Sequence, residues 1–474
     1  MKLRTILIVL LLLTAIALVG CASSAPATKA PEAVPTKAPE AAATEAPAAK
    51  EAPPAEEEKV TIVYWADPRF QNVKGMEDQT QEVGDYERIL AEKFMEQHPN
   101  VTVEVETLQW NELSTKVAAA IAAGSPPDVL KDYLGRTGAY ANQGLLEPLQ
   151  DAIPKEEYDD ILPSLVDLYT INGDLHGLPL FFWVTHLIGN TTIAKDAGAE
   201  DLLPDESGTW TFDQFEQALA AQAIPDERWP LAMQVSSEQG DYNTLGYFWG
   251  MGAKLYENGD YTHTALNSPE GVAALTKLVE WYNKGYIIPG VTTISNNDLL
   301  NAMYQGQSAI TGGGLGLLPI IENAQKEGKV TVEWDPYIAA FPHAEGVKSA
   351  GLAAGPTGVV VFKQDDPVKR KWAIEFARFL ASPDLIEQYC INANQFPARK
   401  SVGNPFEGDP KFTKVSEWIK EYGVEDMGLS SPTYAEVRVL LQPELQAAFL
   451  GKKTPEQALA DYEKAANEVL SKNK

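Results

Sequence analysis

The chain has 474 residues, and its 66 Asp plus Glu against 38 Lys plus Arg give a formal net charge of −28. Such an acidic surface repels nucleic acid phosphates and anionic lipid headgroups, so we expect no nucleic acid partner. About 415 residues follow the first 59, which is too long for one compact core and predicts two lobes.

The first twenty residues predict a signal peptide. Lys2 and Arg4 give a basic start, and the apolar stretch from Ile6 to Val19 is too short for a membrane span. The stretch ends in LVGC at Cys21, which resembles the lipobox of bacterial lipoproteins. That resemblance implies cleavage before Cys21 and acyl chains on Cys21 that anchor the chain to a membrane. The alternative is a secretory signal with a chance cysteine.

Residues 21–59 predict a disordered tether. They are rich in Ala, Pro and Glu, lack aromatic residues and contain Val34 as their one large aliphatic side chain. Too little apolar surface is available to offset the entropy of ordering. A Pro-stiffened tether of this kind holds a folded body away from the membrane.

Alternating strands and helices begin the body and indicate an α/β protein. The periodicities predict a strand at Val60–Trp65, a helix at Tyr86–Gln97, a strand at Val101–Val105 and a helix at Trp110–Ala123. Strand, helix, strand order predicts parallel pairing. Ligands of such sheets bind beyond the C-terminal ends of the strands, so the residues just after Tyr64 become candidates.

The stretch from Gly173 to Asn190 contains three adjacent rings. Pro179 favours an extended backbone, so LPLFFWV predicts a strand. Adjacent side chains of a strand point to opposite faces, so the three rings cannot all lie on the same face of the strand. Phe181 and Phe182 favour packing, whereas Trp183 is the candidate for a binding wall.

Several segments carry a family resemblance in their order and spacing. They are VTIVYWADP, FMEQHPNVTVEVETLQWNELSTKVAAAIAAGSPPDVL, YANQGLLEPL, INGDLHGLPL, HLIGNTTIAKDAG, SGTWTFDQFEQAL, YQGQSAITGGG, WAIEFARFLASPD, NQFPARKS and GKKTPEQAL. Together they resemble the extracellular solute-binding proteins, family 1, of ATP-driven sugar importers. The maltose- and glycerol-phosphate-type binding proteins belong to that family, and the resemblance spans Val60 to Leu470.

This resemblance implies a two-lobed type II periplasmic-binding-protein fold with three hinge crossings. Each lobe would hold a sheet flanked by helices. The implied N-terminal lobe takes residues 60–178 plus 337–383, and the C-terminal lobe takes 179–336 plus 384–474. Such a receptor closes on a solute that contacts both lobes, because differential affinity alone can shift the equilibrium between open and closed forms.

The resemblance also implies a set of solute contacts from both lobes. Carried over position by position, they are Trp65, Asp67, Arg69, Arg136, Trp183, Asn190, Tyr242, Gly313, Gly314, Tyr434 and Arg438. Asn243 is offered beside Tyr242. Two rings that relatives often carry are replaced by Gly189 and Gly316, which alters the familiar oligosaccharide platform. Core packing of Trp65 and a solvated loop for the two charged residues after it are the alternatives.

We therefore expect a monomeric, lipid-anchored, extracytoplasmic binding subunit of an ABC importer for a sugar or oligosaccharide. A glycerol-phosphate compound or another anion is the alternative solute. A surface glycan-degrading enzyme and a receptor that serves a sensor kinase are the alternative functions. The five histidines are too dispersed for a metal site, and we expect neither a cofactor nor catalysis. Cys390 is expected to be a buried, inert thiol.

Overall fold

The computed structural model describes residues 58–67, 70–257 and 261–473. The chain divides into two units, residues 1–56 and residues 57–474, and the described residues belong to the second. The predicted signal peptide, nearly all of the predicted tether and Cys21 lie outside the described residues. Arg69 lies outside them as well.

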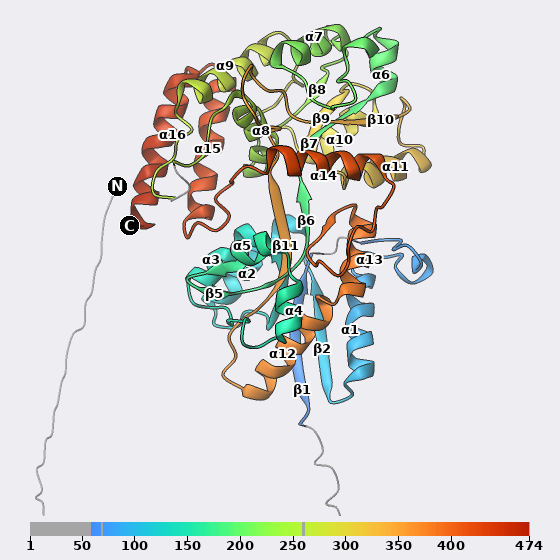
Figure 1. The fold of residues 1–474 in the computed structure, drawn as a ribbon, viewed down its shortest axis with the longest axis vertical. Coiled ribbons are helices and arrows are strands. Elements are labelled where there is room, and N and C mark those ends of the chain that lie inside the picture. Colours follow the sequence, from blue (N-terminus) through green and yellow to red (C-terminus); the bar gives the residue numbers. More distant parts are fainter. Residues whose placement is uncertain (1–57, 68–69, 258–260, 474) are drawn as a thin grey trace, which may run out of the picture. The chain divides into compact units, whose positions relative to one another are not determined.

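A mixed sheet of six strands organises the first lobe, in the order β12-β6-β11-β3-β1-β2. Its strands are β1 (Val60–Ala66), β2 (Val101–Thr107), β3 (Val129–Tyr133), β6 (Leu178–Val184), β11 (Ala354–Val361) and β12 (Phe396–Pro397). β1 is parallel to β2 and β3, which confirms the predicted pairing. β11 is antiparallel to β3 and β6, and Figure 1 shows β11 beside β6.

Helices cover both faces of this sheet. They are α1 (Asp85–Gln97), α2 (Trp110–Ala122), α3 (Leu134–Asn142), α4 (Lys155–Asp160), α5 (Pro163–Tyr169), α12 (Pro367–Leu380) and α13 (Pro383–Ala393). Alternate residues of β1 face different clusters, as strand geometry requires. Tyr64 packs on Phe376 of α12, whereas Trp65 belongs to a cluster with Leu113 and Val117 of α2.

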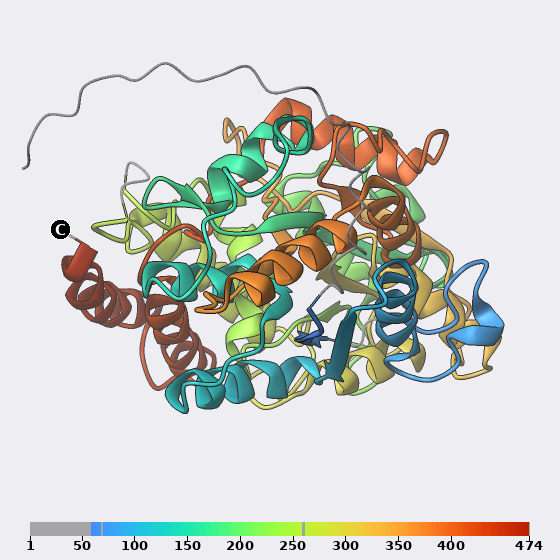
Figure 2. The same ribbon diagram turned by 90° about the horizontal axis from the view of Figure 1, so that it is seen from below.

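The second lobe is built on a sheet of four strands in the order β10-β7-β9-β8. These are β7 (His186–Asn190), β8 (Leu231–Ala232), β9 (Ile310–Gly313) and β10 (Pro336–Ala339). Its helices are α6 (Thr191–Asp196), α7 (Phe212–Gln222), α8 (Asp241–Met251), α9 (Pro269–Asn283), α10 (Asn296–Tyr304), α11 (Leu317–Lys326), α14 (Pro410–Tyr422), α15 (Tyr434–Phe449) and α16 (Pro455–Leu470). α15 and α16 lie side by side in both views (Figure 1, Figure 2).

Short elements complete the described chain. They are the two-stranded ribbon of β4 (Thr170–Ile171) and β5 (Asp174–Leu175), and the 3-10 turns η1 (Glu77–Gln79), η2 (Glu200–Leu202), η3 (Glu238–Gly240) and η4 (Ser471–Asn473).

The chain passes between the two sheets at places that differ from the implied lobe boundaries. β6 stays in the first sheet through Val184, which pairs with Ala354, so the first passage falls at Thr185 rather than at Leu178. β10 pairs with β7, so the second passage comes after Ala339. β12 pairs with β6, which places the third passage after Pro397.

Candidate solute-binding site

A cavity of about 260 Å³ lies where the two sheets meet. It is lined by Trp183, Thr185, Tyr242, Asn243, Gly313, Gly314, Gly316, Leu317 and Gln395. The first lobe contributes the end of β6 and the connection between α13 and β12. The second lobe contributes the start of α8, the end of β9 and the start of α11. Four of the predicted contacts therefore come together here: Trp183, Tyr242, Gly313 and Gly314.

Two aromatic rings form one wall of this cavity. The rings of Trp183 and Tyr242 meet edge to face, with centroids 4.5 Å apart. Gly355, on the neighbouring strand β11, leaves room for the indole, because a Cβ there would lie 1.8 Å from Trp183 Cζ2. Phe181, in contrast, is fully buried, and Phe182 stacks on Phe396, as the sequence predicted for these two rings.

Glycines bring the second lobe close to the first. A Cβ at Gly314 would lie 2.7 Å from the Val184 carbonyl oxygen, and one at Gly312 would lie 2.5 Å from Asn243 Oδ1. Neither glycine has a positive φ, so close approach is what requires them. α11 begins directly after this loop, but the N–H groups of Leu317 and Leu318 already donate to the Gly314 and Leu315 carbonyl oxygens, and Pro319 has no N–H.

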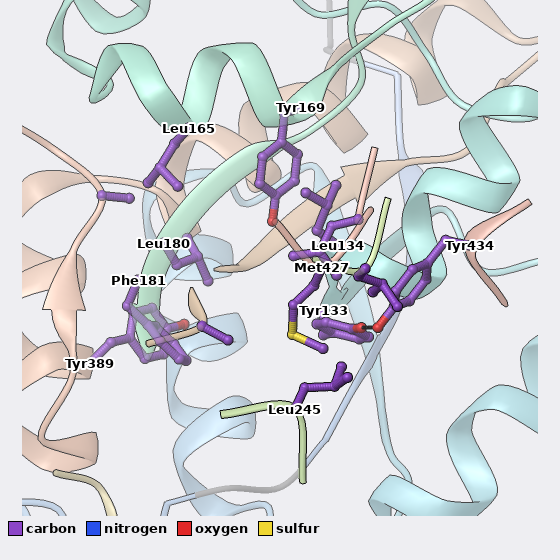
Figure 3. Close-up of a cluster of buried hydrophobic side chains, with 14 of the residues drawn as sticks. Tyr133, Leu134, Leu165, Tyr169, Leu180, Phe181, Leu245, Tyr389, Met427 and Tyr434 are labelled. Atoms are coloured by element: carbon purple, nitrogen blue, oxygen red, sulfur yellow. Dashed lines mark hydrogen bonds between the residues drawn. The ribbon is translucent and has the colours of Figure 1, made fainter. Parts of the chain in front are cut away.

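Three tyrosines join the lobes behind the aromatic wall. The Tyr242 hydroxyl donates to the Tyr133 hydroxyl at 2.8 Å, and Tyr133 is hydrogen-bonded to Tyr434 as well. Figure 3 shows Tyr133, from the end of β3, and Tyr434, from the start of α15, with their hydroxyls directed at each other. Burial raises the pKa of all three hydroxyls, so they keep their protons.

Arg438 stands behind this group and is bound by a carboxylate. Its Nε and Nη2 donate to the two oxygens of Asp241 at 2.6 and 2.9 Å. The guanidinium also lies 5.0 Å from the Tyr242 ring centroid. Burial raises the pKa of Asp241, although the ion pair with Arg438 opposes that rise. Arg438 thus fixes the Tyr242 ring and the Asp241 carboxylate.

Arg136, the other predicted arginine among the described residues, is also bound by a carboxylate. Arg136 Nε lies 2.8 Å from one oxygen of Asp132, which is fully buried in β3. Burial raises the pKa of Asp132, and Arg136 opposes the rise. Arg136, Tyr434 and Arg438 do not line the cavity.

Three further candidates lie in packed surroundings. Trp65 is 8% exposed within the cluster that includes Leu113, and Lys116 Nζ lies 4.9 Å from its ring centroid. Asp67 is buried rather than part of a solvated loop, 3.7 Å from Lys131 Nζ. Asn190 is fully buried and caps α6, where its Oδ1 accepts from the Thr192 N–H at 3.0 Å.

A second cavity of about 600 Å³ shares Gly316 and Gln395 with the first. Phe70, Tyr304, Pro319, Ile320, Asn323 and Asn392 are among the residues that line it. The cavity reaches from the α13 end of the first lobe to α10 and α11 of the second. Gly316 therefore lines both cavities, and no side chain at this position separates them.

Sequence reasoning missed Gln395 and Tyr133. Gln395 lies in the segment NQFPARKS, which carries the resemblance but no recognisable chemistry. Tyr133 precedes α3 and gave no signal. Both positions gain their roles from contacts with residues distant in the sequence. Gly189 did give a signal, and the Tyr337 ring now fills its space: a Cβ there would lie 2.2 Å from Tyr337 Cζ.

Other chemistries find little support in the described part of the chain. It contains no group of three or more His, Cys, Asp and Glu side chains placed to hold a metal ion. None of its helices combines the length and apolar character that a membrane span needs. Cys390 is fully buried, and burial raises the pKa of its thiol, as expected of an inert cysteine.

Comparisons with known proteins agree with this architecture. The sn-glycerol-3-phosphate-binding periplasmic protein UgpB of Escherichia coli (strain K12) is 24% identical over 415 residues, covering 82% of this chain and 90% of that protein. The lactose-binding protein of Rhizobium radiobacter is 22% identical over 333 residues, covering 69% and 71%. An ABC transporter solute-binding protein from Thermotoga lettingae TMO, crystallised with alpha-D-tagatose, shares the fold. Its TM-score is 0.72 at 22% identity, covering 87% of this chain and 100% of that one.

The fold and the family expected from the sequence are thereby confirmed. The two-lobed architecture is that of the solved sugar-binding structures, with mixed sheets flanked by helices. A family model described as bacterial extracellular solute-binding protein matches residues 90–417, which is well over half of the chain. The chain therefore belongs to the family of bacterial extracellular solute-binding proteins.

Proposed function

We propose that this chain is the solute-binding subunit of an ABC importer, and that it captures a neutral sugar or oligosaccharide between its lobes. The observation that carries the proposal is the lining of the 260 Å³ cavity, which combines two aromatic rings with uncharged polar groups from both lobes. Aromatic rings stack on the apolar faces of sugars, and hydroxyl and amide groups bond the sugar hydroxyls.

The charges around the cavity favour a neutral solute over an anion. Among the described residues, none that lines it carries a charge. Arg438 is bound by Asp241 and Arg136 by Asp132, so an anionic solute would have to displace a buried carboxylate from its guanidinium. Such an exchange costs several kcal/mol because the displaced charge would be left without its partner. The glycerol-phosphate alternative is therefore the weaker one.

The same lining favours binding over catalysis. A glycoside hydrolase places two carboxyl groups across the bond it cleaves. Among the described residues that line the smaller cavity there is no carboxyl group. A bound sugar would be held, and release to a membrane permease would follow when the lobes open.

Localisation follows from the family and from the N-terminal residues. Membership of an extracellular family implies an extracytoplasmic location. The LVGC segment supports lipid attachment at Cys21, and residues 22–59 have the composition of a tether. The body would then meet solute outside the membrane and present it, as a monomer, to the permease.

A thermal-shift panel tests the proposed solute class. Glucose, maltose, lactose, chitobiose, galacturonate and sn-glycerol 3-phosphate are each titrated into the full chain. We expect a neutral sugar to raise the melting temperature, because a ligand present at 100 times its Kd stabilises the folded form by about 2.7 kcal/mol.

Calorimetry at low and high salt then checks the charge of the bound species. Affinity for a neutral sugar should stay constant, since salt screens only charged partners. A shift with sn-glycerol 3-phosphate alone would contradict the proposal. So would sugar cleavage, detected by chromatography of the incubated panel.

A further inference from the structure

Gln395 occupies the point where the two cavities meet. Gln395 lines both cavities, although only 9% of its surface is exposed. The residue follows α13 directly, after Asn394 ends that helix with a φ of 50°. Its own N–H donates to the Cys390 carbonyl oxygen at 3.1 Å, which fixes the backbone here. The position of Gln395 is therefore set by the first lobe.

The side chain of Gln395 lies against the second lobe. A Cβ at Gly316 would come within 2.6 Å of Gln395 Nε2 and 2.9 Å of the Ala393 carbonyl oxygen. Asn394 Nδ2 also donates to the Leu315 carbonyl oxygen at 3.4 Å. Any side chain at position 316 would push the Gln395 amide away. Because Gly316 has no side chain, the Gln395 amide of the first lobe fits against the second lobe at this position.

In the described part of the chain, the Gln395 amide has no partner of its own. Within residues 58–67, 70–257 and 261–473, its side chain makes no hydrogen bond and no ion pair. The same holds for Asn243, whose Oδ1 stands beside Gly312 at the opposite side of the cavity. Neither residue contributes to the fully buried polar atoms of the described chain that lack a hydrogen-bond partner, so both amides are open to the cavity and can bond a molecule that enters it.

We propose that Gln395 and Asn243 are specificity-determining residues, and that their two carboxamides read the hydroxyl groups of the neutral sugar. This inference rests on the proposed function. A carboxamide donates and accepts at once, so it suits hydroxyl groups, which do the same. A carboxylate or an ionised phosphate only accepts, so it can bond the N–H₂ half of each amide but leaves the carbonyl half without a donor. The two amides therefore add to the selectivity of the cavity for neutral solutes.

The placement of the two amides also links recognition to closure. Gln395 belongs to the connection between α13 and β12 in the first lobe, and Asn243 belongs to α8 in the second. A sugar that bonds both amides gains affinity only in the form where both surround it. Such differential affinity is what shifts the lobes toward the closed form.

Isothermal titration of matched variants tests the inference, with the neutral sugar that gives the wild type its largest thermal shift. Gln395→Met and Asn243→Leu remove the amides at similar volume. We expect each to raise Kd about 10-fold, the effect of one lost hydrogen bond with a buried polar partner left unpaired. Gln97→Met, the same change at an exposed position of α1, should leave Kd unchanged.

Melting temperatures without sugar separate recognition from a structural role. Because neither amide has a partner among the described residues, both variants should melt at the wild-type temperature. Unchanged Kd values in both variants would overturn the inference while leaving the proposed function intact. A lower melting temperature with unchanged affinity would also overturn it. If the wild type binds sn-glycerol 3-phosphate and no neutral sugar, the proposed function fails first and this inference fails with it.

Discussion

Two tryptophans with the same predicted role have different surroundings. Trp183 is partly exposed and lines the cavity beside Tyr242. Trp65 is 8% exposed and packs with side chains of α2. A ring that faces a cavity is available to a solute, whereas a ring within a packed cluster contributes to folding. We therefore expect Trp183 to affect solute binding and Trp65 to affect stability.

Substitution by alanine should separate the two roles. Trp183→Ala is expected to weaken binding of the neutral sugar at least about 10-fold, because it removes one wall of the cavity. Trp65→Ala should lower the free energy of unfolding by about 3–5 kcal/mol, as expected for a buried tryptophan. Urea denaturation and calorimetry measure both quantities in both variants. Loss of binding in Trp65→Ala with full stability would show that Trp65 contacts the solute.

At the scale of single residues, the sequence pointed to the aromatic wall but not to its polar counterpart. Trp183 stands in a strand with two neighbouring rings, and that alternation is a local pattern. Gln395 becomes informative only through its contact with Gly316, which lies far from it in the sequence. No local periodicity carries such a contact.

At the scale of elements, local patterns predicted the strands and helices well. The predicted strand Val60–Trp65 and helix Tyr86–Gln97 appear as β1 and α1 within one residue at each end. Apolar periodicity sets such elements, and His98 with Pro99 ends the helix. The passages between lobes were less predictable. β6 is held in the first sheet by β11 and β12, which lie about two hundred residues later, so its length could not be inferred from its own residues.

His186 is a buried histidine at the first passage between the lobes. It begins β7, is fully buried and has Nδ1 3.0 Å from the Leu187 carbonyl oxygen. Its Nε2 has no hydrogen-bond partner among the described residues. Burial lowers the pKa of His186 to about 4. The folded protein therefore holds this ring neutral where an unfolded chain would protonate it.

Stability should consequently fall as the pH drops. The unfolded histidine takes up a proton near pH 6.5, and the folded one does so only near pH 4, so protonation in this window favours the unfolded state. We expect His186 to contribute about 2 kcal/mol of lost stability by pH 5. Urea denaturation at pH 7, 6 and 5 measures the slope, and His186→Leu should flatten it. An equal slope in that variant would contradict the assignment.

At the scale of the whole molecule, hydrogen bonds between tyrosine hydroxyls connect the two lobes. Tyr133 belongs to the first lobe, and Tyr242 and Tyr434 belong to helices of the second. Tyr242 is shared, because its ring lines the cavity while its hydroxyl bonds Tyr133. A solute that presses on the Tyr242 ring therefore acts on a contact between lobes. Recognition and closure become parts of one equilibrium.

Removing one hydroxyl should weaken solute binding without touching the cavity. Tyr133→Phe loses the bonds to both partner tyrosines, each worth about 1 kcal/mol, so we expect Kd for the neutral sugar to rise by up to about 30-fold. Tyr140→Phe is the matched control, because the Tyr140 hydroxyl makes no hydrogen bond within the described residues.

Small-angle X-ray scattering with and without sugar reports how far the lobes close. Tyr133→Phe should remain more open at a sugar concentration that closes the wild type and Tyr140→Phe. The hydroxyl bonds stabilise only the form in which Tyr133 reaches the second lobe, so their loss must appear in closure as well as in affinity. A variant that closes like the wild type and binds sugar equally well would show that the three tyrosines stabilise each lobe but do not couple them.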